Sequence, residues 1–77
     1  MATTNQRIRN HVRRHRRAID GLTQQNLADQ VGVTRQTIIS IERGSYNPSV
    51  GLALALAQTL RVTVEQLFEI VSEDDHG

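Results

Sequence analysis

Histidine and arginine are the residues of this 77-residue chain whose types and spacing suggest chemistry. His11 and His15 stand four residues apart, the spacing at which two imidazoles on one helix can bind a metal ion. The segment His-Val-Arg-Arg-His contains no carboxylate, and the arginines around it repel a cation. The chain has no cysteine nucleophile, no glycine-rich phosphate loop and no acid/base pair beside a predicted pocket. The residue types therefore argue against a metal site, a cofactor and an enzyme.

The charges are distributed unevenly along the chain. Residues 1–50 hold eight arginines against three acidic residues, a net charge of +5, whereas residues 51–77 hold one arginine against five acidic residues, a net charge of −4. A basic segment of this kind indicates a polyanionic partner. No apolar run is long enough to span a bilayer, and the N-terminus lacks the apolar segment of a signal peptide. Together with the absence of cysteine, these features lead us to expect a cytoplasmic protein without membrane contact.

The stretch from Leu22 to Gly44 predicts two short helices joined by a tight turn. Thr23 and Thr34 are suited to cap helix starts, because a threonine hydroxyl can accept from a free backbone N–H. Gly32 and Gly44 stand where the helices must end, and glycine adopts the positive φ that such an end requires. We expect helices over about residues 24–31 and 35–43, which together form a helix-turn-helix.

Three further helices are expected around this motif, over about residues 5–18, 50–60 and 64–70. The first has a thin apolar stripe at helical spacing, formed by Ile8, Val12, His15 and Ile19. Its other faces are crowded with arginine, and two interpretations remain open: a solvated face or a face that contacts phosphates. Nothing in the chain shows the strict alternation of a half-buried strand, so we expect an all-α fold of five helices.

The fourth and fifth helices have clear start signals. Ser49 is expected to cap the fourth, and Thr63 with Gln66 fits the capping box that opens the fifth. The fourth helix is expected to bury Val50, Ala53, Leu54, Leu56, Ala57 and Leu60. Its outer side is also apolar, through Leu52 and Ala55.

The chain from about residue 8 to residue 68 resembles the Cro/repressor-type helix-turn-helix family, also called the Xre family. The resemblance is carried by Leu22 to Gly44 (LTQQNLADQVGVTRQTIISIERG), by Asn47-Pro48-Ser49 and by Val62 to Phe68. It implies a five-helix, lambda-repressor-like bundle that binds double-stranded DNA sequence-specifically in the major groove. It also implies a role as a transcriptional regulator, a repressor that acts as a homodimer.

The resemblance assigns roles by position. The second helix of the motif is the recognition helix, whose outward residues contact base edges; here these are Arg35, Gln36, Thr37, Ile39 and Ser40. Their chemistry agrees, because arginine can pair with guanine, glutamine with adenine, and threonine or isoleucine can touch a thymine methyl. The residues expected to contact the DNA backbone are Gln24, Thr34, Arg43, Tyr46 and Asn47.

Glu42 has a different expected role, since the family pairs this glutamate with a largely buried arginine of the first helix. Counting back from Leu22 gives Arg17, whereas counting along the apolar stripe gives Arg16. We favour Arg16, because the helical face decides which side chain can reach and a loop absorbs an extra residue at little cost. Asn26 stands where the family often has glutamate, so the helix that begins near it is expected to start less firmly.

A family member of this type would read an inverted-repeat operator with two copies. We expect the contact surface between them to contain Leu52, Ala55, Ile70 and Val71. The helix-turn-helix domain is expected over residues 1–71, followed by an acidic disordered tail over residues 72–77. The alternative is an antitoxin-like or other protein-interaction module, which would bind a protein partner through the apolar side of the fourth helix and the acidic C-terminus.

Overall fold

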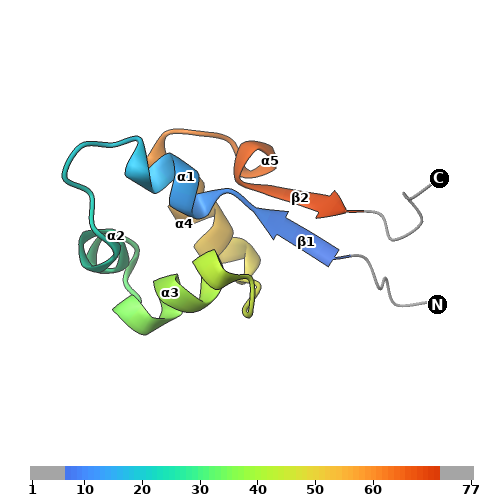
Figure 1. Cartoon of the computed structure of the whole chain (residues 1–77), viewed down its shortest axis with the longest axis horizontal. Coiled ribbons are helices and arrows are strands. Elements are labelled where there is room, and N and C mark those ends of the chain that lie inside the picture. The colour runs from blue at the N-terminus through green and yellow to red at the C-terminus, as the bar shows by residue number, and fades with distance from the viewer. Residues whose placement is uncertain (1–6, 72–77) are drawn as a thin grey trace.

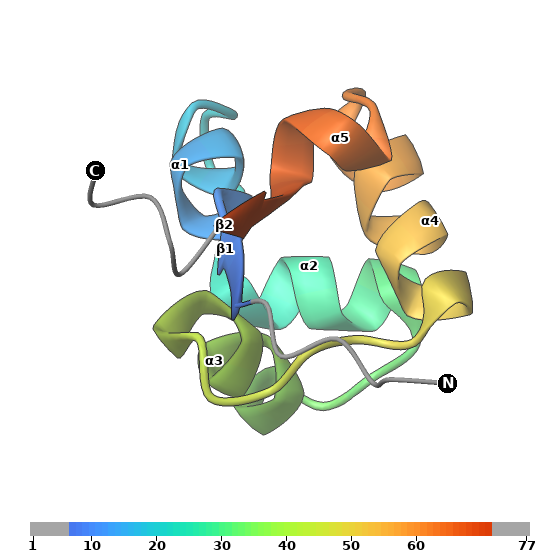
Figure 2. The ribbon, with the colours of Figure 1, turned by 90° about the vertical axis from the view of Figure 1, so that its right-hand side faces the viewer.

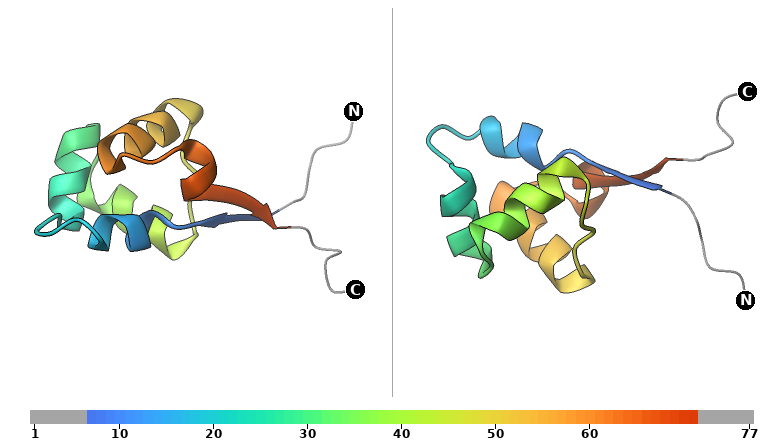
Figure 3. Two further views of the ribbon diagram at one scale, coloured as in Figure 1. Left: turned by 90° about the horizontal axis from the view of Figure 1, so that it is seen from above. Right: turned by 60° about the horizontal axis from the view of Figure 1, so that its bottom comes forward.

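The computed structural model describes residues 7–71 of the chain. Five helices pack around one core, and a two-stranded ribbon joins the two ends of the described segment and projects from the bundle (Figure 1, Figure 3). In chain order the elements are β1 (Arg7–Asn10), α1 (Val12–Arg17), α2 (Gln24–Val31), α3 (Arg35–Arg43), α4 (Val50–Leu60), α5 (Val64–Leu67) and β2 (Phe68–Val71). The tail predicted over residues 72–77 and the first residues of the predicted first helix lie outside the described residues.

The expectation of a purely all-α fold is wrong, because β1 and β2 pair as antiparallel strands. Ile8 lies opposite Ile70 and Arg9 opposite Glu69. The predicted first helix therefore begins only at Val12, and the predicted fifth helix ends at Leu67. The partners are about sixty residues apart in the sequence, so periodicity within either segment carries no sign of the pairing. Of the predicted stripe on the first helix only Val12 is buried, because Ile8 and Ile19 lie on the ribbon and on the loop after α1.

The helix-turn-helix has the predicted bounds and caps. The hydroxyl of Thr23 accepts from Asn26 N (3.0 Å), and that of Thr34 accepts from Thr37 N (3.2 Å). Gly32 ends α2 with φ 78° and Gly44 ends α3 with φ 87°, both in the left-handed region. Asn26 completes the capping box in place of the family's usual glutamate, because its Oδ1 accepts from Thr23 N (3.4 Å). Figure 2 shows α2 and α3 lying close together on one side of the bundle.

The core joins all five helices. Its buried members are Val12, Leu27, Ala28, Ile38, Ile41, Leu56, Ala57, Leu60 and Leu67. Ile38 and Ile41 fix the inner face of α3, and burial of side chains of this size stabilises the fold by roughly 2 kcal/mol each. This packing leaves the opposite face of α3 toward solvent.

Helix α4 faces the core with a different side from the one predicted. Val50 is 76% exposed and Leu54 is 55% exposed, although both were expected to be buried. Leu52, expected on the outer side, is half-buried and packs against the core. The prediction failed because α4 is apolar almost all round, so the hydrophobic period does not define one inner face.

The remaining local signals agree with the sequence. Ser49 Oγ accepts from Leu52 N (3.1 Å), and Thr63 with Gln66 forms the predicted capping box at the start of α5. Arg61 ends α4 in the left-handed region with φ 61°. Within residues 7–71, every helix is too short or too polar to cross a membrane.

Candidate nucleic-acid interface

The solvent face of α3 presents the five residues predicted to contact bases. Arg35 and Gln36 are exposed in its first turn, directly after the Thr34 cap. Thr37, Ile39 and Ser40 are half-buried along the same helix. A guanidinium and an amide projecting from the start of an anchored helix can both make bidentate hydrogen bonds to base edges in a major groove.

Hydroxyl groups line one flank of α3. A shallow recess there is formed by Thr34, Gln36, Thr37, Ser40, Ser45 and Tyr46. The hydroxyls of Thr34 and Thr37 lie 3.0 Å apart and share a hydrogen bond. Ser45 donates to Ser40 O through both Oγ (3.2 Å) and its backbone N–H (3.0 Å), which fixes the loop that carries Tyr46 against the helix. Tyr46 and Asn47 are exposed on this loop, so this flank offers neutral donors suited to backbone phosphates.

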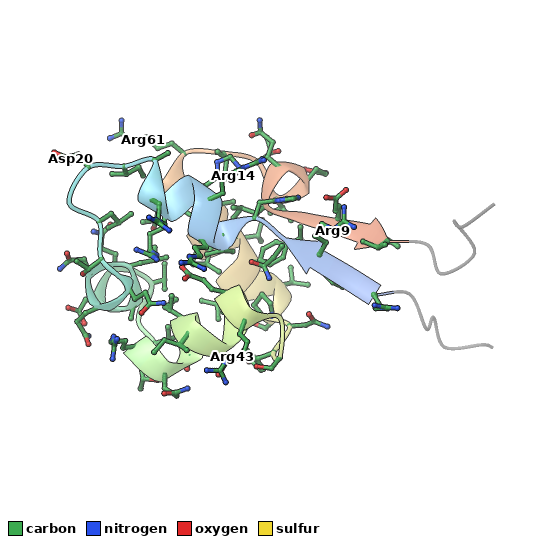
Figure 4. All side chains as sticks on the ribbon, viewed as in Figure 1. Arg9, Arg14, Asp20, Arg43 and Arg61 are labelled. Carbon is green, nitrogen blue, oxygen red and sulfur yellow. The ribbon has the colours of Figure 1, made fainter. Side chains whose placement is uncertain are left out.

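Arginines line the opposite flank. Arg43 is exposed in the last turn of α3, and its side chain points away from the bundle (Figure 4). It shares a recess of about 600 Å³ with Ile39 and with Arg13 and Arg17 of α1. The sequence reasoning named Arg17 only as the alternative partner of Glu42, did not single out Arg13, and left open whether the arginine-rich faces of the first helix are solvated or contact phosphates. The spacing of four residues between Arg13 and Arg17 places both on one face of the helix, and this is the signal in the sequence that could indicate a shared surface.

Glu42 lies at the centre of a hydrogen-bonded cluster behind α3. Its Oε2 accepts from Arg16 Nε (2.7 Å), and its Oε1 accepts from Arg16 Nη2 (3.3 Å) and from Gln24 Nε2 (3.1 Å). Arg16 also donates to Leu22 O (3.1 Å). These bonds identify Arg16, not Arg17, as the arginine that pairs with Glu42. The pair is largely buried, since the side chains of Arg16 and Glu42 are 12% and 5% exposed. The cluster ties α1 and the start of α2 to the last turn of α3.

Gln24, expected to hold a phosphate, thus has a partner inside the protein. It is half-buried at the start of α2, and one of its two amide protons is donated to Glu42. Its second amide proton and the N-terminal end of α2 are what it can offer to an anion. Thr34 is similarly engaged, since its hydroxyl caps α3.

The two histidines of the predicted metal spacing lie in different environments. His11 Nε2 donates to Glu69 Oε2 (2.6 Å), and Arg9 lies 3.7 Å from the same oxygen. The hydrogen bond from His11, with a smaller contribution from Arg9, keeps the pKa of Glu69 below its ordinary value. His15 Nε2 is buried without a hydrogen-bond partner among residues 7–71. In that same part of the chain, no three histidine or acidic side chains gather in a way that would hold a metal ion.

The residues predicted to join two copies are spread over two elements. Ala55 is half-buried on α4, while Ile70 is 61% exposed on β2 and Val71 is half-buried at its end. Leu52 packs on the core, and the exposed apolar side chains of α4 are Val50 and Leu54.

Comparison with known proteins gives consistent matches. The model of a helix-turn-helix family matches residues 14–67. An HTH-type transcriptional regulator of Methanothermobacter thermautotrophicus is 50% identical over 68 residues, which cover 87% of this chain and 96% of that protein. The HTH-type regulator YgzD of Bacillus subtilis is 41% identical over 58 residues, covering 75% of this chain and 88% of that protein.

A solved structure is similar as well. The restriction-modification controller protein C.AhdI from Aeromonas hydrophila superimposes with a TM-score of 0.66 at 34% identity. The match covers 73% of this chain and 83% of the controller protein.

Proposed function

The chain belongs to the helix-turn-helix (Xre-type) family of transcriptional regulators, and on this premise we propose that it represses transcription as a homodimer on an inverted-repeat operator. Membership makes it a sequence-specific DNA-binding protein and not an enzyme. In this proposal the protein acts in the cytoplasm on double-stranded operator DNA. Side chains read the base edges by hydrogen bonds and apolar contacts, which need no cofactor.

The placement of α3 is the observation that carries the base-reading part of the proposal. Arg35 and Gln36 stand exposed in the first turn of a helix whose start is capped by Thr34 and whose inner face is buried through Ile38 and Ile41. A rigid helix with a solvated arginine and glutamine at its N-terminal end fits the docking of a recognition helix in a major groove. Thr37, Ile39 and Ser40 are then the further base-facing residues, with Thr34, Arg43, Tyr46, Asn47 and Gln24 along the backbone.

The first prediction concerns base reading. Selection of bound sequences from random duplexes in a mobility-shift assay is expected to give one preferred operator. Arg35→Ala or Gln36→Ala should then weaken binding to it by about 1–3 kcal/mol and relax the base preference at one position per half-site. Arg61→Ala is the matched control, because Arg61 is exposed on the other side of the molecule from α3 (Figure 4). An unchanged preference after Arg35→Ala would contradict the assignment of α3.

The homodimer proposal is supported by the outer face of α4. This helix contains no charged residue, and its side chains Val50 and Leu54 are largely exposed. Leu54 and Ala55 border a recess that also includes Val62 and Val64. One recognition helix reads too few base pairs to single out a site in a genome, and a second copy on a two-fold axis both doubles the reading and covers an apolar face.

The second prediction tests the outer face of α4 as the contact between two copies, with substitutions at residues other than Leu52. Because Leu52 packs on the core, the informative substitutions are Val50→Glu and Leu54→Glu. Each is expected to reduce binding to an inverted repeat by more than about tenfold, since charge in an apolar contact costs several kcal/mol. Sedimentation with and without the operator duplex measures the number of chains bound.

The control for this experiment is Leu54→Met, which retains an apolar side chain of similar volume and should leave two chains bound. Ile70→Glu then asks whether the ribbon also takes part. One chain bound to an asymmetric site, unaffected by either glutamate on α4, would rule the dimer out. Lower expression of a reporter placed behind the selected operator is the expected sign of repression.

A further inference from the structure

Helix α1 presents an arginine-lined recess beside the recognition helix. Arg13 and Arg17 are exposed one turn apart on α1, and they line the same recess as Ile39 and Arg43 of α3. The other residues of its lining are Arg16, Gln24 and Glu42, which are bonded to one another. The recess therefore combines a neutralised inner wall with three arginines at its exposed side, and we call it the α1 recess.

The three exposed guanidinium groups of the α1 recess lack an ion-pair partner in the part of the chain that the structure describes. Among residues 7–71, Arg13, Arg17 and Arg43 form no ion pair, whereas the carboxylate of Glu42 is held by Arg16. Like charges at i, i+4 destabilise a helix by a few tenths of a kcal/mol. An arrangement with this cost is explained when an anion occupies the space between the charges.

A second recess adjoins the α1 recess, with which it shares Arg16, Arg17 and Gln24. The lining of this second recess includes Gln24 and Gln25 at the start of α2 and Arg35 at the start of α3, and one acidic residue, Asp20, borders it as well. The basic surface thus extends from the first turn of the recognition helix, past Arg17, to Arg43 in the last turn. A row of positive charge parallel to a base-reading helix matches the phosphate backbone that borders a major groove.

We propose that the α1 recess binds backbone phosphates of the operator duplex, so that Arg13 and Arg17 make helix α1 part of the DNA interface. This inference rests on the proposed function. It assigns to two arginines of α1 a sequence-independent contact, which sets how deeply and in which orientation α3 lies in the groove.

Arg14 provides a matched control on the same helix. It is exposed and carries the same charge as its neighbours, but its side chain points away from α3 (Figure 4). It lies near Glu69, whose pKa it helps to lower, and it does not line the α1 recess. If only overall charge mattered, alanine at Arg13, Arg14 or Arg17 would weaken DNA binding equally. If a phosphate is contacted, the loss of affinity is confined to the substitutions of Arg13 and Arg17.

The first test measures affinity for the selected operator by fluorescence anisotropy as a function of salt. Arg13→Ala and Arg17→Ala are each expected to weaken binding about fivefold at physiological salt, equally on operator and unrelated duplex. Each should also lower the slope of log K against log salt by about 0.9 per protomer, whereas Arg14→Ala should change neither quantity appreciably. Melting temperatures of the variants establish that all of them are folded.

The second test locates the phosphate. A neutral methylphosphonate is placed at single backbone positions flanking the half-site, and the wild-type protein is expected to lose about fivefold in affinity at one or two of them. The Arg17→Ala variant should lose no further affinity when the methylphosphonate is at the phosphate that Arg17 contacts, because the positive partner of that phosphate is already missing. Additive losses at every position would overturn the inference.

The outcomes separate this inference from the proposed function. If the wild-type protein binds the operator and Arg35→Ala relaxes its base preference at one position per half-site, but Arg13→Ala and Arg17→Ala behave like Arg14→Ala, the α1 recess is a solvated surface and only this inference fails. If the wild-type protein binds no duplex at all, the proposed function fails first. A loss of affinity confined to Arg13→Ala and Arg17→Ala, which disappears when the methylphosphonate is at one particular position, supports both the inference and the proposed function.

Discussion

At the scale of single residues, Glu42 connects the fold to the recognition surface. Its side chain is 5% exposed, and its carboxylate accepts from two nitrogens of Arg16 and one of Gln24. A buried ion pair adds little net stability compared with an apolar pair, but loss of one partner leaves a desolvated charge. The cluster therefore holds the last turn of α3 in position, next to the exposed side chain of Arg43.

The third prediction follows from this geometry. Glu42→Ala is expected to lower the free energy of unfolding by about 3–5 kcal/mol, because it leaves Arg16 as an uncompensated buried charge. Arg16→Ala should be similarly destabilising, and Arg17→Ala, which removes an exposed arginine, should cost less than about 0.5 kcal/mol. Chemical denaturation of the three variants side by side makes the comparison. A loss under about 1 kcal/mol for Glu42→Ala would show that the pair behaves like a surface salt bridge.

At the scale of elements, the ribbon is attached to the recognition helix by one asparagine. Asn10 Nδ2 donates to Ile41 O (2.8 Å), near the end of α3, and Asn10 Oδ1 accepts from Val12 N (3.1 Å) at the start of α1. The backbone N–H of His11 adds a bond to Leu67 O (2.8 Å). The end of β1 is thereby bonded to α1, α3 and the end of α5, and the sequence analysis gave Asn10 no role.

The fourth prediction is that Asn10→Ala destabilises the fold by about 2 kcal/mol, since it removes two part-buried hydrogen bonds and leaves Ile41 O and Val12 N without this partner. Asn10→Asp retains the acceptor but places a carboxylate against a carbonyl oxygen, so it should be at least as destabilising. Asn47→Ala, which changes an exposed loop asparagine, is the matched control and should be nearly neutral. Equal melting temperatures for all three variants would show that the ribbon is not coupled to α3.

At the scale of the whole molecule, the uneven charge distribution places opposite charges in the two halves of the chain. The arginines of α1 and α3 border the surface assigned to DNA, whereas three of the eight acidic residues, Glu73, Asp74 and Asp75, fall in the C-terminal segment outside the described residues. At physiological ionic strength charges act over about 8 Å, so such a segment influences association mainly at low salt.

The fifth prediction concerns this C-terminal segment. Deletion of residues 72–77 raises the formal net charge from +1 to +4, because Glu73, Asp74 and Asp75 are removed. Affinity for unrelated duplex DNA should increase, most strongly at low salt, since less negative charge repels the phosphates. The variant that keeps residues 72–77 but has all three acidic residues changed to their amides should show the same increase. A melting temperature lowered by the deletion but not by the amide variant would indicate a structural role instead.

The sequence by itself determined the elements whose signals are local. Caps such as Thr23 and Thr34 act on N–H groups three residues away, and Gly32 and Gly44 end helices through their own positive φ. The bounds of α2, α3 and α4 follow from such signals, and so does the exposure of Arg35 and Gln36 on α3. These features depend on contacts within one or two helical turns, so the residues that make them are neighbours in the sequence.

Only the tertiary structure decided the features that join distant segments. The pairing of β1 with β2 and the bond from Asn10 to Ile41 connect positions that no local period relates. The inner side of α4 was undetermined, because a helix that is apolar almost all round can bury more than one face and the neighbours decide which. The exposed arginines of α1 are alike in type, and only the packing of α1 against α3 places Arg13 and Arg17, but not Arg14, in the recess that Ile39 and Arg43 of the recognition helix also line.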